Sequence, residues 1–119
     1  MDSEDELTQF NQLLSECSKL LIESGCSSNR LESLLAKLGG IWNFEVESLA
    51  LPTGVSIMVK KNGKQSVSLS RVRNWQINLD KIQQINDAVD LFFSEKPEIS
   101  EALKTLKAIE ESPAPTLLG

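Results

Sequence analysis

Residues 42–69, WNFEVESLALPTGVSIMVKKNGKQSVSL, determine the fold class, because the apolar residues here recur at every second position instead of every three or four. Trp42, Phe44 and Val46 alternate with polar residues, which predicts a half-buried strand. The alternation slips at residues 49–51, where three apolar residues are adjacent, and this slip predicts a bulge or the end of the strand.

Two turn signals divide the stretch into three strands. Pro52-Thr53-Gly54 has the composition of a turn. Asn62-Gly63 is the strongest short hairpin signal, since a type I′ turn requires positive φ at both central residues. The inward face of the second strand and the continuation into the third are marked by apolar residues: Val55, Ile57 and Val59, then Val67 and Leu69. The stretch therefore predicts a three-stranded antiparallel meander.

Helical patterns flank the meander on both sides. Apolar residues spaced by three and four predict an amphipathic helix at 7–24, stopped by Gly25, and a second helix at 29–38, ended by Gly39-Gly40. Two further helices follow the sheet, and the first is capped by Asn78. The order of two helices, three strands and two helices predicts an α+β fold, with helices on one face of a small antiparallel sheet.

The bulk composition is that of one ordinary globular domain of 119 residues. We expect the domain to span residues 1–111 and the proline-containing residues 112–119 to form a linker. The net charge of −5 argues against nucleic-acid binding, which needs a basic face. No window approaches the roughly 18–20 apolar residues of a membrane span, and the acidic N-terminus differs from a signal peptide.

The side chains available for chemistry are few. Histidine and tyrosine are absent, which removes Ser-His and Cys-His catalysis and His-ligated zinc. Cys17 and Cys26 lack the Cys-x-x-Cys spacing and further ligands that a metal site would need, and a reduced, intracellular compartment is the simplest interpretation. We therefore expect no enzyme activity, no cofactor and no metal. A small hydrolase using Cys26, Thr53 and a carboxylate is the less favoured alternative.

Two candidate sites adjoin the predicted turns. Glu23 and Arg30 flank the turn after the first helix, where an ion pair between them would be structural or would orient a ligand or an interface. We favour the structural interpretation, because exposed ion pairs of this kind are common beside turns and contribute only about 0–1 kcal/mol to the stability of the fold. Thr53 could offer a hydroxyl and backbone N–H groups to a ligand, although a turn of this kind more often only reverses the chain.

A third candidate is the basic segment 60–81, which carries six Lys or Arg residues against one acidic residue. Its charge could serve to keep the sheet edge soluble, to contact anionic lipid headgroups, or to bind an anionic solute. The last function would use Arg71 and Arg73 beside the helix N-terminus at Asn78. Trp75 lies in the same irregular segment, where we expect it to be exposed and to contact a partner subunit or an arginine.

Three blocks of sequence, in order and with matching spacing, resemble one known family. They are Leu20–Gly25 followed by Arg30-Leu31-Glu32; Leu51-Pro52-Thr53-Gly54; and Arg71-Val72 with Ile77-Asn78-Leu79 and Asn86. The resemblance is to the threonine/serine exporter family, which includes a two-component dicarboxylate exporter, and it covers roughly residues 10–110.

The resemblance implies a soluble domain on the cytoplasmic face of the inner membrane, followed by membrane helices that export small polar solutes. The expected role of this domain is to regulate, gate or assemble the exporter. Its expected partners are its own downstream transmembrane domain or a membrane partner subunit, further copies of itself, and anionic lipid headgroups. A free-standing ligand-binding or dimerisation module is the alternative.

Overall fold

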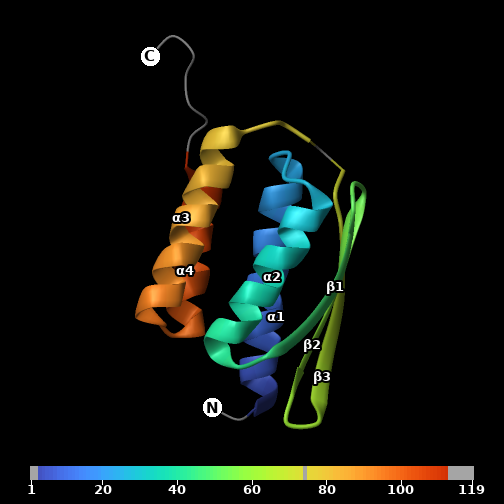
Figure 1. The fold of residues 1–119 in the computed structure, drawn as a ribbon, viewed down its shortest axis with the longest axis vertical. Helices are drawn as coiled ribbons and strands as arrows, with labels where there is room; N and C mark the ends of the chain where they lie inside the picture. The colour runs from blue at the N-terminus through green and yellow to red at the C-terminus, as the bar shows by residue number, and fades with distance from the viewer. Residues whose placement is uncertain (1–2, 74, 113–119) are drawn as a thin grey trace.

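The structure is a computed structural model that describes residues 3–73 and 75–112. The described residues form seven elements (Figure 1): α1 (Ser3–Glu23), α2 (Ser28–Trp42), β1 (Glu45–Leu51), β2 (Gly54–Lys61), β3 (Lys64–Arg71), α3 (Leu79–Glu95) and α4 (Ile99–Glu111). This order confirms the predicted α+β class. Apart from Ser112, the predicted linker at 112–119 lies outside the described residues.

The elements stack in three layers, as Figure 1 shows, with the sheet outermost, α1 and α2 in the middle, and α3 and α4 beyond them. The central helix is α1, which contacts β2, β3 and each of the other three helices. Its residues Leu13, Leu14 and Cys17 are completely buried for this reason. Among the described elements, α3 and α4 contact helices but no strand.

The sheet has the strand order β1-β2-β3 and is antiparallel throughout, as predicted. Asn62 and Gly63 have φ values of 53° and 78°, which confirms the type I′ turn. Of the two alternatives predicted for residues 49–51, the end of the strand is confirmed, since β1 ends at Leu51. The bulge is wrong, because β1 pairs with β2 in one unbroken register from Glu45 to Leu51. Ala50 faces the core, while the two leucines beside it face outward, so this strand carries apolar residues on both faces.

The predicted end of the second helix at Gly39-Gly40 is also wrong. Helix α2 continues to Trp42, which had been predicted on a strand, and ends at Asn43 with φ 61°. Gly39 instead allows β1 to approach the helix, since a Cβ there would lie 2.7 Å from Val46 Cγ2 and 2.8 Å from the Phe44 carbonyl oxygen. The glycine therefore serves helix–strand packing and does not end the helix.

A small polar network joins the sheet to α1. The side chain of Asn11, only 4% exposed, donates from Nδ2 to Ser66 Oγ at 2.9 Å and accepts at Oδ1 from Ser68 Oγ at 2.7 Å. The inward face of β3 is thus polar, and its apolar residues Val67 and Leu69 face solvent.

Candidate functional site

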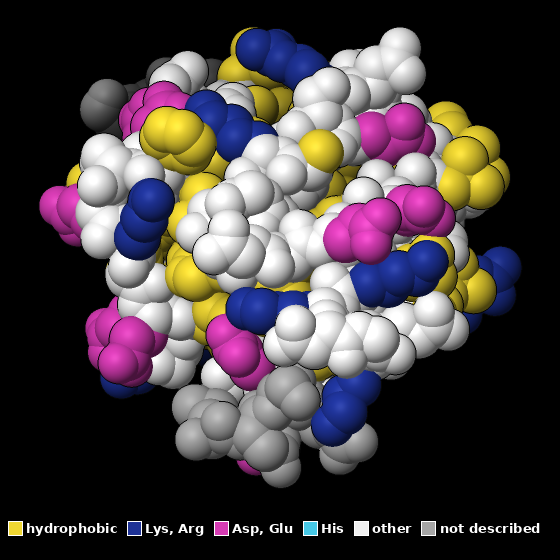
Figure 2. Space-filling view, turned by 60° about the horizontal axis from the view of Figure 1, so that its bottom comes forward, with side chains coloured by type: hydrophobic (Ala, Val, Ile, Leu, Met, Phe, Trp, Pro, Cys, Tyr) yellow, Lys and Arg dark blue, Asp and Glu magenta, His cyan; other side chains and the backbone are white. Residues whose placement is uncertain are grey.

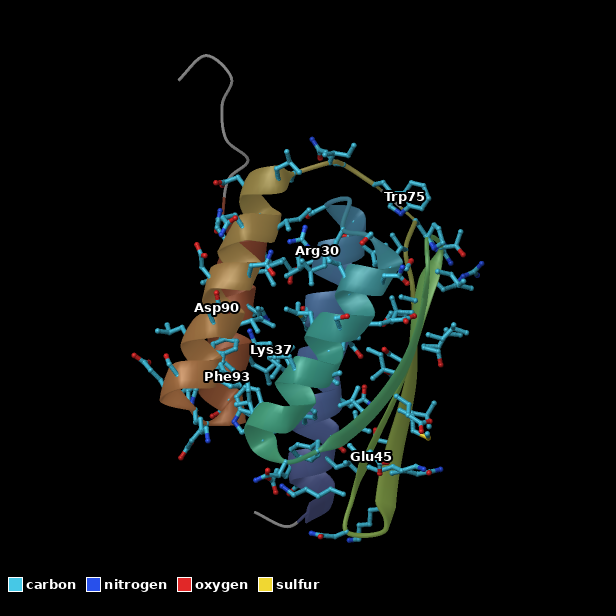
Figure 3. All side chains as sticks on the ribbon, in the orientation of Figure 1. Arg30, Lys37, Glu45, Trp75, Asp90 and Phe93 are labelled. Atoms are coloured by element: carbon cyan, nitrogen blue, oxygen red, sulfur yellow. The ribbon has the colours of Figure 1, made fainter. Side chains whose placement is uncertain are left out.

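All seven candidate residues of the sequence lie toward one end of the fold, which we call the loop end. It consists of the α1–α2 turn, the β1–β2 turn, the β3–α3 loop and the adjoining ends of the helices and strands (Figure 1). Figure 3 shows Arg30 and Trp75 toward this end, far from Glu45. The elements alternate in direction, so segments distant in sequence meet here. The seven residues are Glu23, Arg30, Thr53, Arg71, Arg73, Trp75 and Asn78.

Backbone hydrogen bonds attach the β3–α3 loop to the end of α1. The N–H of Gln76 donates to the Glu23 carbonyl at 2.8 Å, and the N–H of Asn78 donates to the Ser24 carbonyl at 3.0 Å. These carbonyls lie at the end of α1, where helix geometry leaves carbonyls without intrahelical partners. Asn78 Oδ1 accepts from the Lys81 N–H at 2.9 Å, which confirms the predicted N-cap of α3.

The predicted ion pair between Glu23 and Arg30 is not formed within the described part of the chain. Gly25, with φ 100°, reverses the chain between the two helices, and the two side chains lie in different depressions. Glu23 lines a cavity between α1, the β3–α3 loop and α4, whereas Arg30 lines a groove between α2 and α3 together with Cys26 and Asn86.

The cavity that contains Glu23 is polar and has a volume of about 240 Å³. We call it the polar cavity; its lining residues are Glu16, Lys19, Leu20, Glu23, Ser24, Gln76, Asn78, Lys81 and Glu110. Lys81 Nζ donates to the Glu110 carbonyl at 3.1 Å, which joins the start of α3 to the end of α4. Of these residues, the sequence pointed to Glu23 and Asn78 and included Lys81 in the basic segment. Glu16, Lys19 and Glu110 lie on the polar faces of helices and carry no local signal of their own.

The carboxyl groups of Glu16 on α1 and Glu110 on α4 face each other in this cavity. Burial raises the pKa of Glu16 above its ordinary value, and the hydrogen bond and negative charge of Glu110 raise it further. Lys107 and Lys19 oppose the change. The proximity of Glu110 therefore favours the protonated form of Glu16 over its charged form.

The outer surface of the loop end is apolar and basic. Trp75, Ile77 and Leu79 are 58%, 78% and 74% exposed, and Arg71 and Arg73 are exposed nearby along the chain. Trp75 and Ile77 line a second depression of about 290 Å³ with Pro52 and the α1–α2 turn. Neither arginine lines the polar cavity that Asn78 lines, so an anion site formed by the two arginines and the N-terminus of α3 stays a prediction.

The thiol chemistry of the site is that of inert cysteines. Burial raises the pKa of Cys26, although the positive charge of Arg30 lowers it in part. The pKa of the completely buried Cys17 rises to about 12 through burial and the neighbouring thiol. Cys26 therefore stays protonated at neutral pH, whereas a nucleophilic cysteine needs a lowered pKa.

Within the residues described, no group of three or more Cys, Asp or Glu residues could hold a metal ion.

The fold and the site define a small α+β module with a ligand-sized polar cavity beside an exposed apolar surface, and none of its described helices has the length and apolarity to cross a bilayer. The chain belongs to the threonine/serine exporter family, whose model (ThrE) matches residues 12–118, nearly the whole sequence. Searches among curated proteins and among solved structures gave no match. Membership of this family connects the module with transport and amino-acid export.

Proposed function

We propose that this chain is the cytoplasmic module of a membrane exporter for small polar solutes, threonine and serine or dicarboxylates. Its role is to regulate, gate or assemble the exporter, and it performs no catalysis. The family match supports the transport function. The lack of histidine and tyrosine and the protonated Cys26 agree with a role that is not catalytic.

The observation that carries this proposal is the position of the exposed apolar surface. Helix α4 ends at Glu111 toward the same end as the β3–α3 loop (Figure 1), so a membrane-spanning part that follows in the chain would begin at the end of the fold that carries Trp75, Ile77 and Leu79. Tryptophan is enriched at membrane–water interfaces, and basic residues are attracted to anionic headgroups. Arg71 and Arg73 add that positive charge. The loop end is therefore suited to face the membrane.

The opposite end carries mixed charge. Figure 2, in which that end comes forward, shows Lys or Arg side chains interspersed with Asp or Glu side chains, with hydrophobic side chains exposed among them. There Lys61 Nζ lies 3.5 Å from Glu6 Oε1 and 4.3 Å from the ring centre of Phe44. Mixed charge of this kind suits contact with water.

Export by the full-length protein tests the proposal. The triple variant Trp75→Ser, Ile77→Ser, Leu79→Ser should lower threonine release from preloaded cells by about fivefold or more, the lower limit of a typical coupling between sites. The matched control is Leu91→Ser, Phe93→Ser, which changes exposed apolar residues elsewhere on α3. The measured threonine release is divided by the amount of exporter protein found in the membrane. Unchanged release by the triple variant would refute the proposal.

A role in assembly is favoured by a separate observation on the outer face of the sheet. Leu49, Leu51, Val67 and Leu69 are each more than half exposed there, and the register places Leu49 and Leu69 on either side of Ser56. Contiguous exposed apolar patches commonly mark interaction sites. We therefore propose that a second copy of the chain covers this face. Light scattering should show an oligomer that Leu49→Lys, Leu69→Lys converts to a monomer; a monomeric wild type would exclude this role.

A further inference from the structure

The polar cavity has the size of a small solute. Its volume of about 240 Å³ corresponds to about eight water molecules at roughly 30 Å³ each. A small solute with about that many non-hydrogen atoms therefore fits within it. Four segments of the chain contribute to the wall: α1, the β3–α3 loop, the start of α3 and the end of α4.

The lining carries both signs of charge. Lys19 and Lys81 supply two ammonium groups, and Glu16, Glu23 and Glu110 supply three carboxyl groups. A solute with only negative charge would meet the carboxylates, and a solute with only positive charge would meet the lysines. A zwitterion can satisfy both sets, because its own charges are separated by only a few bonds.

Ser24 provides an independent sign of a ligand. The residue is only 4% exposed and lines the cavity, and its hydroxyl has no hydrogen-bond partner among the described residues. No described side-chain polar atom is fully enclosed without a partner, so this hydroxyl keeps some access to solvent, and Ser24 belongs to the wall of the cavity. A nearly buried hydroxyl without a partner can donate to or accept from a bound molecule.

The pair Glu16–Glu110 supplies a place for a cationic group. An ammonium group offers three N–H donors and a positive charge, so it can donate to both carboxyl groups and relieve the repulsion between them. The charges that face the pair are those of Lys19 on α1, Lys81 on α3 and Lys107 on α4, together with Glu23 on α1. Because the pKa of Glu16 is raised, binding of an ammonium group should strengthen as pH rises from the ordinary carboxyl range and Glu16 loses its proton.

We propose that the polar cavity binds a free α-amino acid with a small hydroxyl side chain, threonine or serine. The α-ammonium group lies at Glu16 and Glu110, the α-carboxylate at Lys19 and Lys81, and the side-chain hydroxyl at Ser24. This inference rests on the proposed function and deepens it, since the module would then sense the solute that the exporter carries. A bound amino acid would contact α1, the β3–α3 loop, α3 and α4, and it would thereby hold these four segments together.

Calorimetric titration of the chain with L-threonine, L-serine, L-valine and succinate tests the inference. Threonine and serine should bind. Valine, which lacks the hydroxyl but has the shape of threonine, should bind more weakly. Glu16→Gln and Lys81→Met should each weaken threonine binding by about tenfold or more, as expected for loss of a charged hydrogen bond. Titrations repeated at pH values rising from 4.5 should show threonine binding that strengthens as Glu16 loses its proton.

Lys37→Met is the matched control, because Lys37 lies 3.3 Å from Asp90 on another face of the helices (Figure 3) and does not line the polar cavity. It should leave threonine binding unchanged. The absence of binding heat for threonine and serine would overturn the inference. So would succinate binding that Arg73→Ala weakens, because the solute would then lie at the arginines.

The two proposals can fail separately. If no amino acid binds but the Trp75, Ile77, Leu79 variant still stops export, the inference on the cavity is wrong and the proposed function remains. If threonine binds as described but export does not depend on the loop end, the cavity remains a binding site and the proposed function is wrong.

Discussion

Gly39 and Gly40 allow a test in which two adjacent and chemically identical substitutions should change stability in opposite directions. Both glycines lie inside α2, and neither has positive φ. Helix propensity alone would make Gly→Ala stabilising by about 1 kcal/mol at each position. Their surroundings differ, however, since Gly39 is buried against β1 and Gly40 is exposed.

The geometry gives the expected magnitudes. A Cβ at Gly39 would lie only 2.7 Å from Val46 Cγ2 and 2.8 Å from the Phe44 carbonyl oxygen. Phe44 is held in place, because its N–H donates to the Gly39 carbonyl at 2.9 Å and its ring stacks on Phe10 at 4.2 Å. Overpacking costs about 1–3 kcal/mol, and a fixed backbone atom favours the upper part of this range. After the gain in helix propensity, Gly39→Ala should lose about 2 kcal/mol.

A Cβ at Gly40 would meet no atom within 4 Å, so Gly40→Ala should gain about 1 kcal/mol. Urea unfolding followed by the fluorescence of Trp42 and Trp75 measures both changes, provided that the m-values agree. A Gly39→Ala variant as stable as wild type would refute the close approach of β1 to α2. A destabilised Gly40→Ala variant would refute the continuation of α2 through these glycines.

Four further predictions concern single groups. Asn11→Ala should lower the free energy of unfolding by about 1–3 kcal/mol in urea titrations, because it leaves two serine hydroxyls of β3 without their partner. Lys96→Gly should raise the midpoint of thermal unfolding and stabilise the protein by about 1 kcal/mol, since Lys96 holds a left-handed φ of 48° at the end of α3. In the native chain at neutral pH, a thiol reagent should modify Cys26 slowly and Cys17 only after unfolding, as mass spectrometry of the labelled chain would show. The raised pKa of Glu16 means that the folded state binds its proton more tightly than the unfolded state. Stability should therefore fall as pH rises from 4.5 through the raised pKa, and Glu16→Gln should reduce this slope in urea titrations at several pH values.

The class and order of the elements follow from the sequence, because these features depend on local rules. A repeat of two predicts strands and a repeat of three and four predicts helices wherever the chain lies. The turn at Asn62-Gly63 and the cap at Asn78 are equally local, since they depend on the φ preferences or side-chain reach of one or two residues. All of these predictions are confirmed.

The errors arise where a residue serves a neighbour that is distant in space. Gly39-Gly40 has the composition of a helix end, yet the approach of β1 explains Gly39. The run at residues 49–51 appears irregular only if one face of the strand is assumed to be polar. Local pattern cannot distinguish an apolar residue in a core from one on an exposed sheet face.

The candidate site shows the same division. The sequence by itself determined that Glu23, Thr53, Trp75 and Asn78 adjoin turns, because turn and cap signals lie within a few residues. Only the tertiary structure decided that Glu16 meets Glu110, since these residues are 94 positions apart and each belongs to the polar face of a different helix. The packing of α4 on α1 brings them together. A polar helix face looks the same in sequence whether it borders water or a cavity, because the helical repeat records which side is apolar and not what lies opposite the polar side.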